Sequence, residues 1–312
     1  MSGAPRLPAD GRGTVITVGS FDGVHHGHRQ VLEEIAERAR RADRRSVLVT
    51  FEPHPLEVVN PQAAPPLLTL ADERREILAQ CEIDVVVFLA FTRELSQYTP
   101  EQFVRLLIDR FAMKELVIGY DHGLGRGRAG DVNVLRALGE TLGFAVDVVA
   151  EVDVGSRPVS STLVRRAIAG GDLKTAEKLL GRPYSVTAPV VRGAGRGRDL
   201  GYRTINLGLD DPRKLLPPDG VYAVRVEWRR GTAGGMMHQG PRPTYGESER
   251  VIEAHLFDID DDLYGERVKL SWVARLRNVR RFPTPEALKA QLDNDFTAAR
   301  AALTRSRDVG SH

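Results

Sequence analysis

Residues 14–51, TVITVGSFDGVHHGHRQVLEEIAERARRADRRSVLVTF, decide the fold of the first half of the chain. The runs at 14–19 and 46–51 are apolar and rich in β-branched residues, which is typical of buried strands. Between them, the apolar side chains of residues 31–39 recur with the spacing of one helical face. The stretch therefore predicts a strand, a helix and a second strand in succession.

The same alternation continues along the chain. Strand patterns occur at 84–91, 115–120 and 144–152, and helical patterns at 71–81, 100–112 and 131–142. Strands separated by helices favour a parallel sheet with helices on its faces, so the N-terminal part is predicted to be an α/β domain.

The character of the chain changes after two further helical patterns, at 162–169 and 172–180. From Tyr184 onward, helical periodicity gives way to short alternating runs, which indicate a small antiparallel β-barrel or sandwich. A last helical pattern at 284–303 would close this barrel, and only the tail after Thr304 is predicted to be disordered.

A length of 312 residues is longer than most single cores and favours two domains. We expect the N-terminal domain to span residues 1–182 and the C-terminal domain residues 183–312, with a linking stretch near 170–183. No internal repeat is evident.

The composition is that of an ordinary folded protein, with 42% hydrophobic and 28% charged residues. The net charge of +2 is too small to indicate nucleic acid as a partner. Cys81 is the only cysteine, which excludes an intramolecular disulfide and a multi-cysteine metal site. The strongest apolar run, 83–91, is too short to span a membrane, and 1–13 carries no apolar signal segment. We therefore expect a cytoplasmic protein without nucleic-acid or membrane partners, and self-association stays open.

The histidines at the start of the first helix suggest an anion site. His25 and His28 lie three residues apart and share one helical face, beside the free backbone N–H groups of the helix N-terminus. Gly27 would let a phosphate approach the backbone, while the imidazole N–H groups stabilise its charge. The two histidines would then act as phosphate clamps.

Two simpler interpretations compete with the clamp. A histidine pair at this spacing can bind a metal, although only scattered further ligands, such as His54 and His122, are available. Alternatively, the segment is a solvated turn with His26 exposed. In either interpretation, no chemical role is expected for His26.

A glycine pattern further along allows a different class of protein. Gly125, Gly127 and Gly130 satisfy GxGxxG between a strand and a helix, and Asp147 follows at a suitable distance. This arrangement would suit an NAD-dependent oxidoreductase, but that fingerprint normally occupies the first strand-to-helix turn. A non-catalytic protein that senses nucleotide or flavin is a third alternative.

Two motifs together resemble the HxGH nucleotidyltransferases. GSFDGVHHGHRQVL carries the HxGH signature, and VSSTLVR at 159–165 resembles the serine- and threonine-rich segment that completes the family's triphosphate site. Ser160 and Ser161 are N-cap candidates, Thr162 adds a hydroxyl and Arg165 follows one turn later, which suits a second anion-binding helix terminus. Without the first motif, an ordinary helix cap would explain these residues.

The order of further segments resembles the bacterial bifunctional riboflavin kinase/FAD synthetases along nearly the whole chain. The resemblance implies an enzyme that phosphorylates riboflavin to FMN and then adenylates FMN to FAD, releasing pyrophosphate, with ATP as co-substrate and Mg²⁺ as cofactor. It further implies nucleotide contacts from Gly19 and Phe21 and a flavin contact from Asp121. The matching segments are TFEPHP, GYDHGLGRGRAG, LLGRPYSVTAPVVRG, GRGRDLGYRTINL, LPPDGVYAVRV, GPRPTY, VIEAHLFDIDDDLYG and LRNVRRF.

The kinase half contains no Walker-type phosphate loop. GAGRGRDLGYRTINL offers an alternative, in which Gly195 and Gly197 let the backbone wrap a polyphosphate, unless it is merely a flexible basic loop. The resemblance implies that Thr204 and Asn206 hold magnesium and ATP.

This half also departs from the family pattern. Arg203 and Ile205 replace the usual proline and alanine, and His238 replaces an expected asparagine. In an extended segment, residues 204 and 206 share one face, and 203 and 205 lie on the other. The two departures therefore point away from Thr204 and Asn206, which could still bind magnesium. A monofunctional FAD synthetase with a degenerate kinase domain is the alternative.

Two further residues complete the predicted kinase site. Glu253 in VIEAHLFD would be the general base that takes a ribityl hydroxyl proton, unless it is a glutamate facing solvent. Arg277 resembles the family's arginine near flavin and nucleotide, although ion pairing is an equal alternative.

Overall fold

The structure is a computed structural model. It describes residues 6–7, 11–119, 123–150, 153, 158–193, 202–242, 247–259 and 261–308. The chain forms two compact units, 1–161 and 162–312. The division falls at the start of helix α6 (Ser161–Ala169), so α7 (Leu173–Leu180) belongs to the second unit.

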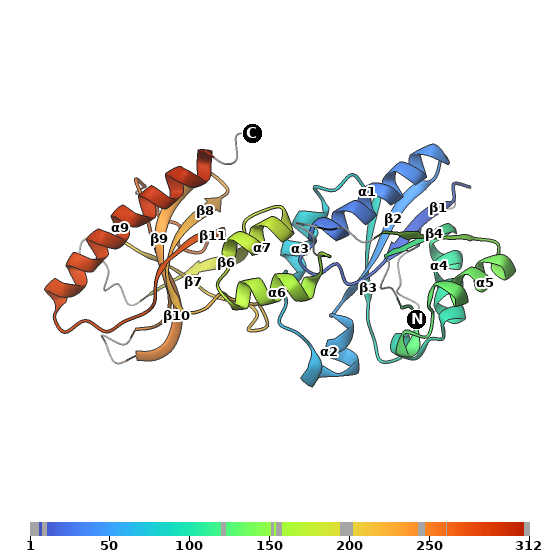
Figure 1. The fold of residues 1–312 in the computed structure, drawn as a ribbon, viewed down its shortest axis with the longest axis horizontal. Helices are drawn as coiled ribbons and strands as arrows, with labels where there is room; N and C mark the ends of the chain where they lie inside the picture. The colour runs from blue at the N-terminus through green and yellow to red at the C-terminus, as the bar shows by residue number, and fades with distance from the viewer. Residues whose placement is uncertain are drawn as a thin grey trace. The chain divides into compact units, whose positions relative to one another are not determined.

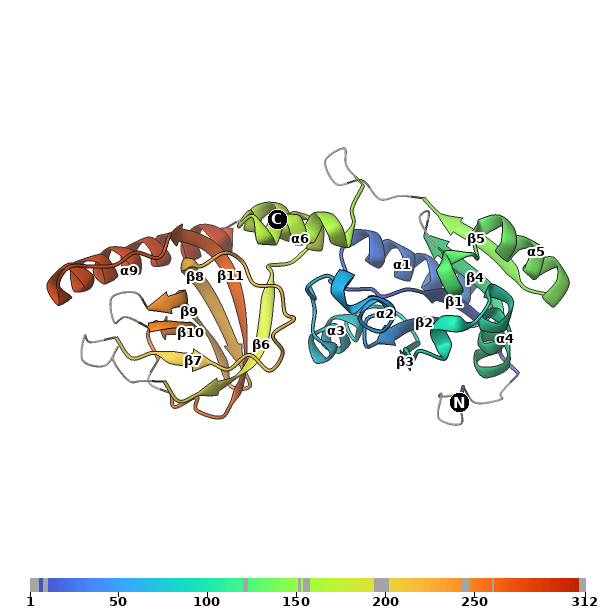
Figure 2. The same ribbon diagram turned by 90° about the horizontal axis from the view of Figure 1, so that it is seen from below.

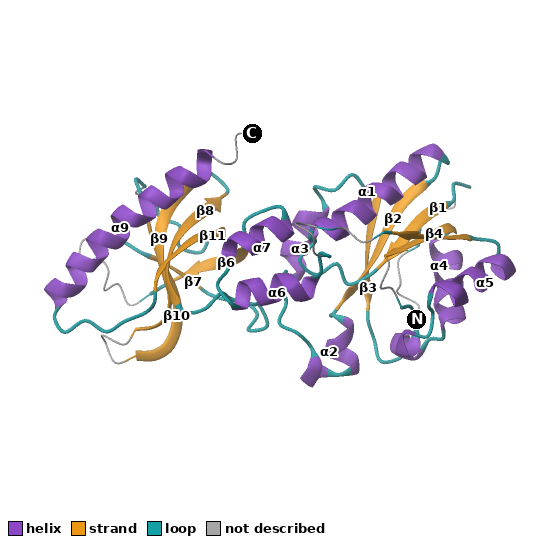
Figure 3. Ribbon diagram, viewed as in Figure 1, coloured by secondary structure: helices purple, strands orange, loops and turns teal. Residues whose placement is uncertain are grey.

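The first unit is built on a five-stranded parallel sheet with strand order β3-β2-β1-β4-β5. Its strands are β1 (Thr14–Val18), β2 (Arg45–Glu52), β3 (Val85–Ala90), β4 (Met113–Gly119) and β5 (Ala145–Val149). The predicted parallel sheet with helices between its strands is thus confirmed (Figures 1 and 3).

Helices cover both faces of this sheet. Alternate residues of β1 enter two separate cores: Val15 packs with α1 and α3, whereas Ile16 packs with α4 and α5. The helices are α1 (His26–Arg41), α2 (Pro55–Val59), α3 (Ala71–Leu78), α4 (Pro100–Phe111) and α5 (Val132–Leu142), with short 3₁₀ turns at Pro61–Ala63, Leu95–Gln97 and Arg126–Arg128.

The strand order places a ligand-binding position at the end of β1. From β1 the chain builds outward through β2 and β3, and then crosses to β4 on the other side of β1. In open α/β sheets, ligands bind at the carboxyl ends of the strands where the order reverses in this way. The loop from β1 to α1, which carries the histidines, starts at that edge.

The second unit contains a closed antiparallel barrel with strand order β10-β7-β6-β11-β8-β9. Helix α9 (Pro285–Asp308) packs along the barrel against β8, β9 and β11, as Figures 1 and 2 show. The predicted barrel with its closing helix is confirmed. The strands are β6 (Ser185–Val191), β7 (Ile205–Leu207), β8 (Gly220–Trp228), β9 (Gly231–Arg242), β10 (Glu247–Leu256) and β11 (Arg267–Arg277).

Two details of this unit differ from the sequence pattern. Helix α9 continues to Asp308, so the disorder predicted after Thr304 is wrong for residues 305–308; Ser306 there accepts a hydrogen bond from Arg225. Strand β9 is missed because its glycines resemble a loop. A Cβ at Gly235 would collide with the backbone of β10, so close packing requires that glycine, and one at Gly234 would displace the end of the Leu303 side chain on α9.

Along the parts of the chain that the structure describes, no helix has the length and apolarity needed to cross a membrane.

Candidate active sites

The loop between β1 and α1 has an unusual backbone. Phe21 and Val24 adopt φ angles of 48° and 39°, in the left-handed region that L residues disfavour, and Gly23 between them has φ 83°. A Cβ at Gly19 would lie 2.9 Å from the Phe21 ring, so glycine there gives the ring room to fold back. Gly19 and Phe21 thus shape the loop that leads to the histidines.

His25 caps helix α1 with its own side chain. Its Nδ1 accepts a hydrogen bond from the backbone N–H of His28 at 3.3 Å, and the residue is 5% exposed. Because Nδ1 is an acceptor, a neutral His25 carries its proton on Nε2. The cap therefore fixes the tautomer that has Nε2–H as the donor for a ligand.

Three rings stack at this helix start. The His25 and His28 rings lie 3.7 Å apart between centroids, and the Phe21 ring stacks on His28 at 4.5 Å. The predicted pairing of His25 and His28 in space is therefore observed. His26 is exposed.

The second motif reaches the same loop. The hydroxyl of Ser161 donates to the Asp22 carbonyl at 3.0 Å. A Cβ at Gly27 would lie 3.3 Å from the His25 ring and 3.6 Å from the Val159 carbonyl, so a larger residue there would crowd the His25 ring. Segments more than a hundred residues apart thus meet at the α1 terminus, as the Ser161–Asp22 separation of 139 positions shows.

The remaining residues of that motif follow along helix α6. The helix begins at Ser161, which puts Ser160 at the N-cap position and Thr162 in the first turn. Arg165 lies one turn further on. The structure leaves the proposed anion contacts of these three residues as predictions.

Sequence reasoning missed a buried clasp that holds the loop. The Asp22 carboxylate, 1% exposed, accepts hydrogen bonds from the backbone N–H groups of Leu68 and Thr69 at 3.0 and 2.8 Å, and from the Thr69 hydroxyl at 2.9 Å. The same hydroxyl accepts the Gly23 N–H at 3.0 Å. The clasp therefore fixes the two residues between Phe21 and Val24.

Arg74 on α3 also supports the loop, at its start. Its guanidinium is buried and donates to the carbonyls of Ser20 and Phe51 at 2.9 and 2.8 Å. Burial lowers the pKa of Arg74, although the nearby Asp22 carboxylate opposes that effect. The only hint in the sequence is an arginine on the inward face of the helix predicted at 71–81.

In the second unit, Thr204, Asn206, Glu253 and His238 gather on one wall of the barrel. The Thr204 hydroxyl donates to a Glu253 carboxylate oxygen at 2.6 Å. Glu253 lies opposite Asn206 of β7 and opposite His238 of β9, so the three form one row across the strands. Because paired residues share a face, their side chains project to the same side.

Gly193 fits this row closely. A Cβ at Gly193 would collide with the Asn206 side-chain amide. The segment that begins the glycine-rich loop therefore passes directly over a predicted ligand. Gly195 and Gly197 of that loop, and Asp121 of the first unit, lie outside the described residues.

Arg277 makes a bidentate ion pair. Its Nε and Nη2 contact the buried Asp295 carboxylate at 3.0 and 2.7 Å, and its Nη1 donates to the Asn278 carbonyl. The ion-pairing alternative thus has an observed partner, and the flavin contact of Arg277 stays a prediction.

The comparisons with known proteins follow the division into two units. The FAD synthetase family model matches residues 7–163, and the riboflavin kinase family model matches residues 180–303. A protein of Pseudomonas fluorescens named bifunctional riboflavin kinase/FMN adenylyltransferase is 38% identical over 97% of each chain. This chain belongs to the bifunctional riboflavin kinase/FMN adenylyltransferase family. A member from Escherichia coli K12 is 37% identical over 92% of each chain.

A solved structure has the same arrangement of elements as this family member. It is titled a macrolide-efflux protein from Streptococcus pneumoniae, is 30% identical, covers 95% of each chain and superposes with a TM-score of 0.84. The shared fold thus extends over both units.

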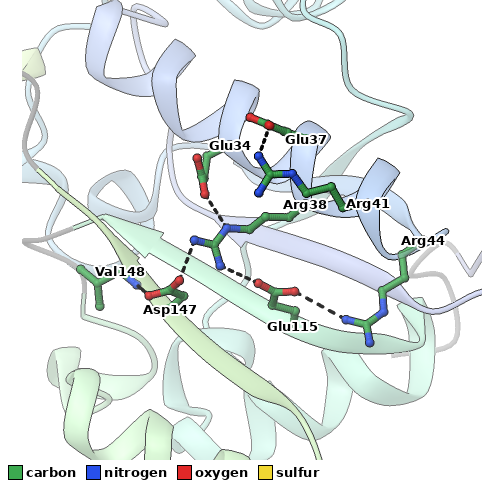
Figure 4. Close-up of polar contacts among 8 residues, drawn as sticks. All are labelled: Glu34, Glu37, Arg38, Arg41, Arg44, Glu115, Asp147 and Val148. Atoms are coloured by element: carbon green, nitrogen blue, oxygen red, sulfur yellow. Dashed lines mark hydrogen bonds and ion pairs between the residues drawn. The ribbon is translucent and has the colours of Figure 1, made fainter.

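The features behind the oxidoreductase alternative have local roles in this family member. A Cβ at Gly125 would collide with Pro100, and one at Gly130 with the Leu124 carbonyl, so these glycines serve a tight loop. Asp147 is engaged by Arg38 of α1, which also contacts Glu115 (Figure 4). A hydrogen bond from the Val148 N–H, and then Arg38, lower the pKa of Asp147.

The Arg38 cluster holds helix α1 on the sheet. Arg38 bonds Glu34 at 2.6 Å, Glu115 of β4 at 2.8 Å and Asp147 of β5 at 2.6 Å (Figure 4). Partial burial alone would lower the pKa of Arg38, but these carboxylates outweigh burial and raise it. The helix that begins at the histidines is therefore anchored to the sheet near its C-terminal end.

Among the described residues, no group of three or more His, Cys, Asp or Glu side chains could hold a metal ion.

Proposed function

We propose that this chain makes FAD in two ATP-dependent steps, phosphorylating riboflavin to FMN in its second unit and joining FMN to AMP in its first. The observation that carries the proposal is the His25–His28 pair at the α1 N-terminus, where the sheet order reverses. Membership of the bifunctional family supports both steps.

Adenylation would take place on the histidine loop. An FMN phosphate oxygen attacks the α-phosphorus of ATP, and the bond to pyrophosphate breaks. Charge that develops on the phosphate oxygens needs fixed donors, which the Nε2–H of His25, the imidazole of His28 and the N–H groups of the helix terminus supply. Arg165 would add a positive charge to the triphosphate. The adenylation step would be accelerated by positioning of the reactants and by charge neutralisation, without a covalent enzyme intermediate.

Phosphorylation would use the row of polar residues on the barrel. Glu253 takes the proton of a ribityl hydroxyl as its oxygen attacks the γ-phosphorus of ATP and ADP leaves. Its carboxylate is already within 2.6 Å of one hydroxyl, that of Thr204, which is the reach a general base needs.

The same row has the donor chemistry that Mg²⁺ requires. Thr204 and Asn206 offer a hydroxyl and an amide oxygen beside the Glu253 carboxylate, and magnesium prefers such hard oxygen ligands. Bound there, the ion would neutralise phosphate charge. The departures at Arg203 and Ile205 leave the Thr204–Glu253 contact in place, which favours a working kinase over a degenerate one.

His28→Ala tests the adenylation site. The variant should lose FMN adenylation by about 100- to 1000-fold, because a donor to transition-state charge is typically worth that much. Riboflavin phosphorylation should persist, because its proposed residues belong to the other unit. Chromatography of riboflavin, FMN and FAD after incubation with ATP and magnesium measures both steps; normal FAD formation by folded His28→Ala protein would refute the clamp.

Thr204→Ala tests the kinase site. It should remove most FMN formation from riboflavin while leaving adenylation of supplied FMN intact, since it deletes a magnesium ligand and a partner of the base. Glu253→Gln keeps the shape and should lower turnover more than ATP affinity. A parent protein that adenylates FMN but makes none from riboflavin would instead establish the monofunctional alternative.

A further inference from the structure

The segment that leads into β7 is not held by the barrel's backbone ladder. The β7–β10 ladder begins, on the β7 side, at the Ile205–Ala254 pair. Thr204 is therefore the last residue before the ladder. Residues 202–204 lie outside this ladder, and side-chain contacts from α9 and β10 reach all three. Thr204 is the residue whose placement matters, because its hydroxyl contacts Glu253.

Each residue of this short segment is tied by a different group. The Tyr202 hydroxyl donates to Asp293 of α9 at 2.5 Å, and the Arg203 carbonyl contacts Nδ1 of His255 at 2.7 Å. A carbonyl can only accept, so Nδ1 of His255 carries a proton. Burial, and then the Asp293 contact, raise the pKa of Tyr202 to about 12, which keeps its hydroxyl a donor.

His255 stands two residues after Glu253 on β10, so both side chains project from the same side of that strand. Its ring is fixed by aromatic neighbours: Tyr202 meets it edge-on at 5.0 Å between centroids, and Phe257 lies at 5.8 Å. A half-buried imidazole held in this way is a rigid donor.

We propose that His255 is a positioning residue of the phosphotransfer site, which fixes the backbone ahead of Thr204 by donating from Nδ1 to the Arg203 carbonyl. The inference rests on the proposed kinase function. One strand, β10, then supplies both the base, Glu253, and the group that aligns the base's hydroxyl partner. His255 itself touches no reacting atom.

Two substitutions separate the hydrogen bond from ring packing. His255→Phe keeps an aromatic ring against Tyr202 and Phe257 but removes the donor. His255→Asn loses the ring but can place an amide N–H near the position of Nδ1. Positioning by the hydrogen bond predicts that the first variant is impaired and the second largely retained, whereas a packing role predicts the reverse order.

Arg203→Pro provides a rescue. The Arg203 side chain is exposed, and proline retains the carbonyl while fixing φ by its ring. If His255 acts by restricting this backbone, the double variant Arg203→Pro/His255→Phe should recover much of what His255→Phe loses. If His255 does not restrict this backbone, Arg203→Pro should change the rate of riboflavin phosphorylation by the same factor in the parent and in His255→Phe.

The readouts are the kcat/KM of riboflavin phosphorylation and amide hydrogen exchange over residues 203–206 in the substrate-free full chain. His255→Phe should lower kcat/KM by about three- to tenfold, the worth of one neutral hydrogen bond, and speed the exchange, with FMN adenylation unchanged as the internal control. Equal kinetics and exchange in parent and His255→Phe, or a larger loss in His255→Asn, would overturn the inference.

The two readouts also keep this inference distinct from the proposed function. A parent that makes no FMN would refute the kinase assignment, and the exchange comparison would still decide whether His255 orders the segment. A parent that makes FMN while His255→Phe shows normal exchange would refute the positioning role alone.

Discussion

Asp22→Asn should impair FMN adenylation without touching a substrate contact. The carboxylate accepts hydrogen bonds from the backbone N–H groups of residues 68 and 69 and from the Thr69 hydroxyl. In the asparagine variant, one oxygen is replaced by an NH₂ group, which would face an N–H donor in a site that is 1% exposed. The variant therefore loses a charge-assisted hydrogen bond and buries opposed donors.

The size of the effect is set by the lost hydrogen bond, and the strained loop is the route by which that loss reaches the histidines. Losing a hydrogen bond to a buried charged group costs about 1.5–3 kcal/mol. The clasp also restrains Phe21 and Val24, whose left-handed conformations each cost about 1–2 kcal/mol. Weakening it lets the loop relax away from the geometry that stacks the histidines. Since about 1.4 kcal/mol corresponds to a tenfold change in rate, adenylation should fall by roughly 10- to 100-fold.

The assay is the initial rate of FAD formation from FMN and ATP, with riboflavin phosphorylation in the same preparation as the control. Thr69→Val, which loses the hydroxyl shared by Asp22 and Gly23, should behave like Asp22→Asn, and Thr69→Ser, which keeps the hydroxyl, like the parent. Full adenylation by folded Asp22→Asn protein would refute the reasoning. Equal losses of both activities would indicate general unfolding instead.

Two further predictions concern the second unit. Gly193→Ala should reduce riboflavin phosphorylation but not FMN adenylation, because the added Cβ would displace the Asn206 amide. Initial rates of both steps test this prediction, and an unchanged rate of FMN formation would contradict it. Fragments 162–312 and 183–312 should both make FMN but no FAD. The shorter fragment should have the lower melting temperature, because it lacks α7, which packs on β11. Equal melting temperatures would place the folding boundary at 182/183, as the sequence pattern suggests.

Local sequence pattern was sufficient to predict both folds: short apolar runs separated by helical patterns indicate the parallel sheet, and alternating runs indicate the barrel. The predicted proximity of His25 and His28 is observed, but not for the predicted reason: His25 is the N-cap and lies just outside α1, so the two residues do not share a face of the helix. The side-chain cap by His25 could not be predicted in the same way. Histidine is an uncommon N-cap residue, and only the hydrogen bond from the His28 N–H to Nδ1 of His25 shows that its ring turns back on the helix.

Contacts between distant segments account for most of what was missed. Asp22 and Thr69 are 47 positions apart, and nothing in the sequence around either residue indicates the other. Strand β9 was hidden for a similar reason, because its glycines accommodate neighbours on α9 and β10 rather than its own conformation. Such residues read as loop or surface in the sequence until the elements that pack on them are known.

The departures at Arg203 and Ile205 show what the geometry of the kinase row depends on. Glu253 faces Asn206 because of the β7–β10 register, which is set by backbone pairing and not by the side chains at 203 or 205. If the extended chain continues from Thr204 into β7, alternation puts Thr204 and Asn206 on one side, so substituting their neighbours leaves the polar row intact. What the Arg203 departure changes, by replacing a proline, is the stiffness of the segment before the ladder begins, and there the Arg203 carbonyl is held from β10 by His255.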